Sequence, residues 1–255
     1  MTKETPQSFV TSGLNPALQT PAEIEAILRR DLPSPPEGVT RVRFYGAGCL
    51  PDLCEGVADV LRRLFSTGDV TVGSDLLGAA RGVLGTRAGV VAILGTGCNS
   101  ALWDGKRIIC NTPPLGYILG DEGSGADLGK RLISALLKNL LPDDLAEAFR
   151  RTHPLSYSEI IESVYRRPAA NRFLASFAPF LHEHLAHPAA RAIVEDSFSS
   201  FITRNLSQYD TPAVSFVGSV AHHFEEPLRA TAARHGLRVD TIVQSPMPGL
   251  IRYHS

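Results

Sequence analysis

Four short segments of the chain combine glycine with polar side chains that could bind a substrate or a phosphate. The first, Val72-Gly73-Ser74-Asp75, puts a carboxylate just past the end of a predicted strand and at the start of a predicted helix. Ligands bind at such strand ends in parallel sheets, and a carboxylate there could accept the proton of a substrate hydroxyl. From this segment alone, the favoured alternative is that Asp75 only caps its own helix.

The second segment, Gly95-Thr96-Gly97-Cys98-Asn99-Ser100, lies between two predicted strands. Its two glycines let backbone amides approach an anion closely, and Thr96, Asn99 and Ser100 add hydrogen-bonding groups. It has neither the lysine of a P-loop nor the third glycine of the dinucleotide fingerprint. A plain hairpin turn is the alternative interpretation.

The third segment, residues 116–125 (GYILGDEGSG), holds two adjacent carboxylates in a glycine-rich loop that leads into a helix. Carboxylates near a helix N-terminus are electrostatically stabilised, so a structural role is open. Asp121 could accept hydrogen bonds from sugar hydroxyls, and either Asp121 or Glu122 could act through water on a metal ion. In the fourth segment, residues 216–221, Gly218 removes a side chain where a flat ligand could lie, although glycine is common at such strand–helix junctions.

A group of histidines, His182, His184 and His187, looks at first like a metal site. His182 and His184 are two residues apart on a predicted helix, so they point to different faces. We expect a solvated helical face here, and the same for His222-His223. No metal ligand is predicted.

Strands and helices alternate in the first part of the chain, which predicts βαβ crossovers and a mainly parallel sheet. The expected strands are 8–11, 42–45 and 70–72. The expected helices start at Thr20 with a capping box, at Asp52 as a second cap, and near Ala79.

The composition shifts after residue 88. Residues 88–109 read as strands joined by tight turns, with Asp104-Gly105 as a hairpin signal. Residues 155–206 are expected to be helical with breaks at Pro168 and Pro188, and a final βαβ unit covers strands 214–217 and 237–243. These patterns predict an α/β protein of two units with a boundary near residues 84–88.

Composition narrows the function. The 255 residues carry a net charge of −1, so no positive field attracts nucleic acid or anionic lipid. No apolar run reaches the roughly 18 residues of a membrane span, and the first thirty residues lack the apolar stretch of a secretory signal. The four cysteines, Cys49, Cys54, Cys98 and Cys110, form no C-x-x-C pair and are expected to be free thiols in a reducing, cytoplasmic compartment.

In order, the segments resemble one family. They are a GLNP turn, SDLLGAARG, LGTGCNS, LGYILGDEGSG, FVGSVA and a closing SPMPGLIRYH. The chain is similar over nearly its whole length to the N-acetylglucosamine kinase and benzoyl-CoA-reductase-type ATPase family, within the sugar kinase/actin/heat-shock-chaperone superfamily. The resemblance implies two ribonuclease-H-like domains, residues 1–86 and 87–255, with a cleft between them and a helical insertion in the second. It also implies ATP and Mg²⁺ as cofactors and phosphorylation of N-acetylglucosamine or a related amino sugar.

The resemblance also suggests roles for individual residues. Asp75 corresponds to the catalytic base. The remaining positions fall into three groups: the second phosphate loop at Gly95, Thr96 and Gly97; sugar contacts at Asn15, Asn99, Gly116 and Asp121; and the adenosine segment at Gly218, Ser219 and Val220.

One departure from the family matters. The family opens with a strand, a D-G-G-x-T/S-x-T turn that grips ATP phosphates, and a second strand, and nothing like it precedes Ser8. We therefore expect a first domain that is incomplete at its N-terminus, with an exposed sheet edge that could pair with another chain, as in a homodimer. The alternative function is a non-catalytic sugar-binding homologue that has lost phosphate binding. An ATPase driving a reductase is less favoured, because the cysteines do not match an iron–sulfur arrangement.

Overall fold

The computed structural model describes residues 8–33 and 38–255. The chain divides into two compact units after Gly78, within helix α3 (Asp75–Val83). The second half of α3 belongs with the C-terminal unit because Gly82 packs there against Pro246: a Cβ at Gly82 would lie 2.6 Å from the Pro246 carbonyl oxygen. The division thus falls earlier than the boundary expected between residues 86 and 87, and the assignment of two ribonuclease-H-like domains with those limits stays a prediction.

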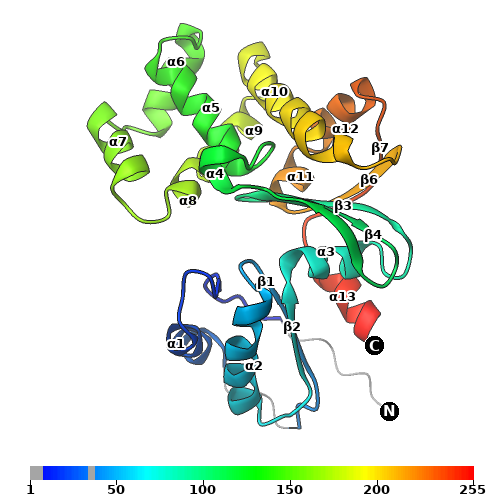
Figure 1. Cartoon of the computed structure of the whole chain (residues 1–255). Coiled ribbons are helices and arrows are strands. Elements are labelled where there is room, and N and C mark those ends of the chain that lie inside the picture. The colour runs from blue at the N-terminus through cyan, green and yellow to red at the C-terminus, as the bar shows by residue number, and fades with distance from the viewer. Residues whose placement is uncertain (1–7, 34–37) are drawn as a thin grey trace. The chain divides into compact units, whose positions relative to one another are not determined.

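The N-terminal unit is a two-stranded parallel sheet covered by two helices. Strand β1 (Val42–Gly46) pairs with β2 (Val70–Ser74), and α1 (Pro21–Asp31) and α2 (Pro51–Phe65) lie on one side of the strands (Figure 1). The buried residues between helices and strands are apolar: Ile24, Leu28, Val57, Val60 and Leu61. This confirms two of the three strands and the first two of the three helices predicted for this part of the chain. Strand β2 ends at Ser74, and α3 begins at the next residue, Asp75.

The capping box predicted at α1 is confirmed. The Thr20 hydroxyl accepts from the N–H of Glu23 at 3.3 Å, and the Glu23 carboxylate accepts from the N–H of Thr20 at 2.7 Å. Two other expectations were wrong. Residues 8–11 form no strand, and Asp52 does not cap α2 but lies in its first turn, because Pro51 already occupies a helical position and Leu50 is the cap residue.

The C-terminal unit is built on a five-stranded mixed sheet in the order β5-β4-β3-β6-β7. Its strands are β3 (Gly89–Leu94), β4 (Cys98–Trp103), β5 (Ile108–Thr112), β6 (Ala213–Val217) and β7 (Arg238–Val243). β3, β4 and β5 pair antiparallel, as the tight turns predicted, whereas β3, β6 and β7 pair parallel through helical crossovers. The carboxyl ends of β3 and β6 therefore lie side by side, at Leu94 and Val217.

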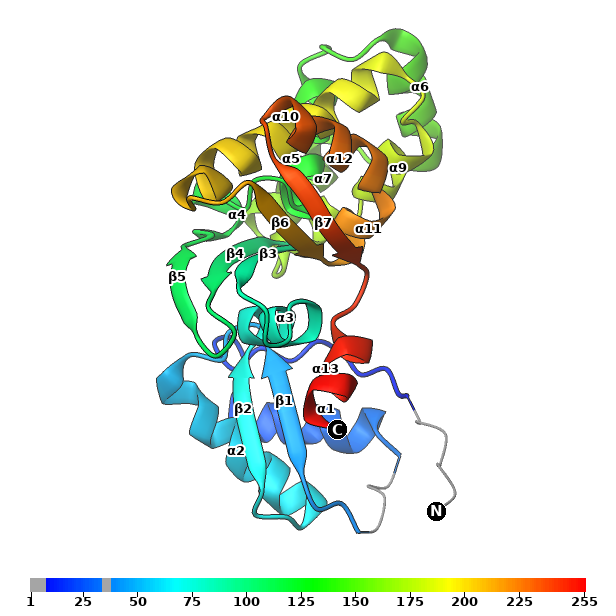
Figure 2. The same ribbon diagram turned by 90° about the vertical axis from the view of Figure 1, so that its right-hand side faces the viewer.

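Helices fill the rest of the C-terminal unit. They are α4 (Gly116–Leu119), α5 (Gly125–Leu137), α6 (Asp143–Thr152), α7 (Tyr157–Tyr165), α8 (Ala170–Ala175), α9 (Ala178–Glu183), α10 (Pro188–Asn205), α11 (Ser219–His223), α12 (Glu225–Arg234) and α13 (Met247–His254). Helices α5, α10, α11 and α12 lie on one side of the sheet (Figures 1 and 2). The expected breaks are confirmed: Pro168 falls between α7 and α8, and Pro188 starts α10.

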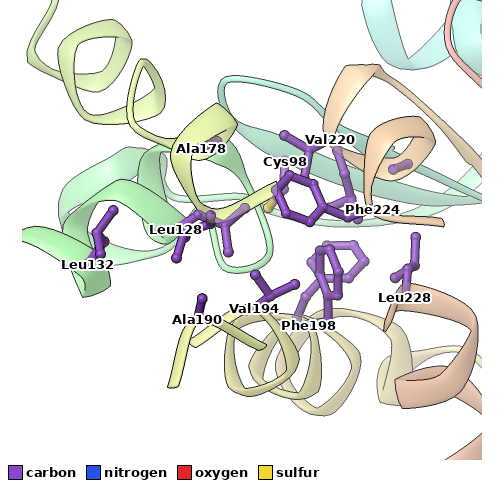
Figure 3. Close-up of a cluster of buried hydrophobic side chains, with 14 of the residues drawn as sticks. Cys98, Leu128, Leu132, Ala178, Ala190, Val194, Phe198, Val220, Phe224 and Leu228 are labelled. Carbon is purple, nitrogen blue, oxygen red and sulfur yellow. The ribbon is translucent and has the colours of Figure 1, made fainter. Parts of the chain in front are cut away.

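The core of this unit locks together the elements that carry the glycine-rich segments. Leu128 of α5, Phe198 of α10 and Phe224 beside α11 are at most 2% exposed and meet in one apolar cluster (Figure 3). Because α5 and α11 are packed into the same core, the loops at their N-termini are held at fixed positions relative to each other. Within residues 8–33 and 38–255, no helix combines the length and the apolar character needed to cross a bilayer.

Candidate nucleotide and substrate site

The hairpin loop at residues 95–97 is tied to the N-terminus of α5. The N–H of Gly125 donates to the carbonyl of Gly95 at 2.8 Å, and the N–H of Ala126 donates to the carbonyl of Thr96 at 3.0 Å. Two amides that a helix normally leaves without an intrahelical partner are thus satisfied by the loop. The N–H groups of Thr96 and Gly97 donate to no residue in the described part of the chain, so this loop still has amides to offer to a ligand.

Asp121, from the glycine-rich segment 116–125, contacts the residue that follows this loop. Its carboxylate accepts a hydrogen bond from the N–H of Cys98 at 3.0 Å, and a Cβ added at Gly97 would lie 3.0 Å from its Oδ1. Glycine at position 97 is therefore what lets the carboxylate approach. Burial raises the pKa of Asp121, and the bond from Cys98 opposes that rise.

The neighbouring carboxylates are occupied by structural partners. Glu122 accepts from Arg204 at 3.1 Å and from Asn205 at 3.4 Å. Asp127 accepts from Ser197 at 2.7 Å and from Arg131 at 2.8 Å. The sequence left open which of Asp121 and Glu122 would face a ligand; these bonds favour Asp121.

A cavity of about 390 Å³ opens beside the loop. Its lining comes from the loop, the start of α5, the segment around α9 and α11: Gly95, Thr96, Gly125, Ala175, Ala178, Pro179, His182, Ser219, Val220, His223 and Phe224. Four of the residues predicted to bind nucleotide, Gly95, Thr96, Ser219 and Val220, therefore lie around one cavity.

Gly218 shapes this cavity without lining it. Its φ is +126°, and a Cβ there would collide with the carbonyl oxygen of Leu94. Only glycine allows β6 to end this close to β3, so that α11 starts next to the 95–97 loop.

The residues predicted to contact sugar are divided between the two units. In the C-terminal unit, Asn99 follows Cys98 on β4, and its Oδ1 accepts from Asn111 at 2.8 Å. Gly116 begins α4 with a φ of +71°, and a Cβ added there would meet no atom within 4 Å beyond its chain neighbours. In the N-terminal unit, the Oδ1 of Asn15 accepts from the N–H of Ala17 at 3.0 Å. Sugar contact by any of these residues stays a prediction.

Asp75 starts α3 directly after β2. The side chain of Ser74, not of Asp75, caps the helix by accepting from the N–H of Leu77 at 3.1 Å. The Asp75 Oδ1 accepts from the N–H of Leu76 at 2.8 Å. Burial raises the pKa of Asp75 more than this bond lowers it. The capping alternative for Asp75 is therefore weakened, because Ser74 already performs that role.

The histidines lie on different faces, as expected. His184 stacks on Phe180 with a centroid distance of 4.1 Å, whereas the ring of His182 lies 5.7 Å from that of His223. Sequence reasoning missed that His182 and His223 line the cavity, since it read both as solvated surface. Among the described residues, no three His, Cys, Asp or Glu side chains gather as a metal-binding group, and all four cysteines are free thiols.

Comparison with known proteins places this geometry in a family. A crystal structure from Porphyromonas gingivalis, provisionally assigned as an N-acetylglucosamine kinase, superposes with a TM-score of 0.93 at 44% identity, covering 96% of this chain and 89% of that one. The chain belongs to the N-acetylglucosamine kinase family. No family model matches it.

Two further comparisons show more limited similarity. A structure from Chromobacterium violaceum, also provisionally assigned as an N-acetylglucosamine kinase, has a TM-score of 0.65 at 19% identity and covers 92% of this chain and 82% of that one, which supports the α/β kinase fold alone. The N-acetylmuramic acid/N-acetylglucosamine kinase of Clostridium acetobutylicum is 29% identical over 130 residues, 47% of this chain. That match spans 41% of the curated relative's length.

Proposed function

We propose that this member of the N-acetylglucosamine kinase family is an ATP-dependent sugar kinase that phosphorylates N-acetylglucosamine or a related amino sugar in the cytoplasm. The observation that carries the proposal is the 95–97 loop. Its carbonyls are held by the N-terminus of α5, while the N–H groups of Thr96 and Gly97 have no acceptor among the described residues. Such a loop at the edge of a cavity suits a polyphosphate chain.

Asp75, at the start of α3, is the proposed base. In this proposal Asp75 accepts the proton of the attacking sugar hydroxyl, which raises the nucleophilicity of that oxygen. The carboxylate already accepts from the N–H of Leu76, so its orientation is set before substrate arrives. Ser74 caps α3, so the Asp75 carboxylate is not needed for that role.

The 95–97 loop is the proposed phosphate cradle. The amides of Thr96 and Gly97 are placed to stabilise charge that develops on the transferring phosphoryl group. These amides are fixed by the bonds from α5, so they need no reorganisation during the reaction. The cavity of about 390 Å³ would take the nucleoside, with Ser219 and Val220 along one wall.

Magnesium fits the residues that are present. Mg²⁺ is usually held by one or two carboxylates together with substrate phosphates and waters, so it does not require a cluster of three protein ligands. Asp121 is the carboxylate nearest to the loop, because it contacts the N–H of Cys98. When bound, the ion would neutralise phosphate charge, and Asp121 would reach it through water or else bind a sugar hydroxyl.

The test is the variant Asp75→Asn. We expect its turnover to fall by orders of magnitude, while the sugar dissociation constant measured by calorimetry changes little, because the amide keeps the size of the carboxylate and one oxygen that can accept from the N–H of Leu76. Asp52→Asn is the matched control, since Asp52 is exposed in the first turn of α2. Near-normal turnover in Asp75→Asn would contradict the role of Asp75. Sugar binding by the wild-type protein without any ATP binding or turnover would instead favour the non-catalytic sugar-binding homologue.

A further inference from the structure

The cavity has two walls of similar construction. Helix α9 presents Ala178, Pro179 and His182 to it, and α11 presents Ser219, Val220 and His223. In each helix these are the first, second and fifth residues, so small or apolar groups are followed by an imidazole one turn further along. Neither wall carries a carboxylate.

The two ends of the cavity differ in the groups that they present. α11 begins beside the 95–97 loop because Gly218 packs against Leu94. On the opposite side, Ala175 packs against Gly125, where a Cβ would lie 3.0 Å from that of Ala175, and α9 begins shortly afterwards. Both helices therefore start at the amide end of the cavity, and the two histidines lie one turn away from it.

The two imidazoles contact each other. The rings of His182 and His223 are 5.7 Å apart between centroids and inclined at 70°, and His182 also lies 5.4 Å from the buried ring of Phe224. Both histidine side chains are exposed, and neither takes part in an ion pair with another described residue. Their ring nitrogens are thus available to a ligand in the cavity, and the ring of His182 packs edge-to-face against Phe224.

A nucleotide would match this arrangement of backbone amides at one end of the cavity and imidazoles at the other. Its phosphates suit the amide end, and its base suits a slot with Pro179 and Val220 on opposing walls and ring nitrogens at the far end. An imidazole offers both a donor and an acceptor when neutral, which is the pattern needed to read the edge of a purine. We infer that His182 and His223 form the base-recognising end of the cavity and set its preference among nucleobases. This inference rests on the proposed nucleotide-dependent function.

The experiment compares binding of ATP, GTP and inorganic tripolyphosphate by calorimetry to the wild-type protein and to His182→Phe and His223→Phe. Phenylalanine keeps an aromatic ring but removes the ring nitrogens. His222→Phe is the matched control, because His222 precedes His223 on α11 and touches its ring but does not line the cavity.

We expect each cavity variant to bind ATP about tenfold more weakly, the effect of one lost hydrogen bond, and to lose discrimination between ATP and GTP. Tripolyphosphate affinity should be unchanged in all proteins, and the control should match the wild type. If the ratio of ATP to GTP affinity is the same in the variants as in the wild type, or if tripolyphosphate affinity falls in parallel, the inference is wrong while the proposed function stands. If the wild-type protein binds neither ATP nor tripolyphosphate, the proposed function fails, and the inference fails with it.

Discussion

The carboxylate of Asp121 accepts a 3.0 Å hydrogen bond from the backbone N–H of Cys98, and so connects two glycine-rich segments that are separate in the sequence. Asp121 is itself in the left-handed region, with a φ of +56°, and is only 7% exposed. Its place is therefore fixed both by its backbone and by its bond. A side chain held this firmly can present its remaining oxygen lone pairs to a ligand without further ordering.

Replacing Asp121 should separate its structural role from its binding role. Asp121→Ala removes the acceptor for Cys98 and puts a residue without a local hydrogen bond at positive φ, so we expect the free energy of unfolding to fall by about 3 kcal/mol. Asp121→Asn keeps the acceptor and tolerates the left-handed conformation, and it should lose about 1 kcal/mol or less. Urea unfolding measures both. Equal losses in the two variants would show that the bond to Cys98 contributes little.

The pH dependence of turnover should report the raised pKa of Asp75. A base must be ionised to act, so kcat/KM should rise as pH increases through that pKa, and the acid limb should lie at a higher pH than an aspartate with an ordinary pKa would give. Stability has the opposite trend. Because burial disfavours the ionised carboxylate, the folded state binds the proton of Asp75 more tightly than the unfolded state does. The stability that this tighter binding contributes is complete below the unfolded pKa of about 3.9 and is lost as pH rises through the raised folded pKa.

Asp121 has a pKa raised by the same cause and is the control for this assignment. The acid limb measured in Asp121→Asn should coincide with that of the wild type if Asp75 is the base. A limb that disappears in Asp121→Asn would assign the titration to Asp121 instead.

Two glycines next to the cavity should respond to alanine in different ways. In Gly218→Ala the new Cβ would strike the backbone oxygen of Leu94 at a φ of +126°, so we expect a loss of several kcal/mol in the free energy of unfolding. A Cβ at Gly95 meets no atom within 4 Å, and its φ is not positive. Gly95→Ala should therefore stay within about 1 kcal/mol of the wild type but bind ATP more weakly, because the methyl group occupies ligand space.

Thermal unfolding and calorimetry on the same two samples make the comparison. A stable Gly218→Ala protein would contradict the close approach of β3 and β6 described above. Unchanged ATP affinity in Gly95→Ala would place the phosphates elsewhere.

Local signals in the sequence predicted much of the fold. Thr20 and Glu23 identified the start of α1, Asp104-Gly105 identified a hairpin, and Pro188 identified the start of α10, because each acts through neighbours a few residues away. The strand expected at residues 8–11 is absent, because a strand does not depend on near neighbours alone. A strand needs a partner from elsewhere in the chain, and no short pattern can say whether one is there.

The candidate site was predictable where glycine marked it. Gly95, Gly97 and Gly218 each permit a close backbone approach, which a sequence can reveal. His182 and His223 were missed because they come from helices about forty positions apart, and each alone resembles an ordinary exposed histidine. Only the packing of α9 and α11 around one core brings their rings to 5.7 Å.

The bonds from Gly125 and Ala126 to the carbonyls of Gly95 and Thr96 make the first turn of α5 and the β3–β4 hairpin one cooperative element. Neither can fray without exposing the other's polar groups to solvent. Any change that loosens α5, even at its apolar face near Leu128 or Leu132, would therefore also disorder the amides of Thr96 and Gly97. We therefore expect substitutions in α5 to change the unfolding temperature and the ligand affinity together.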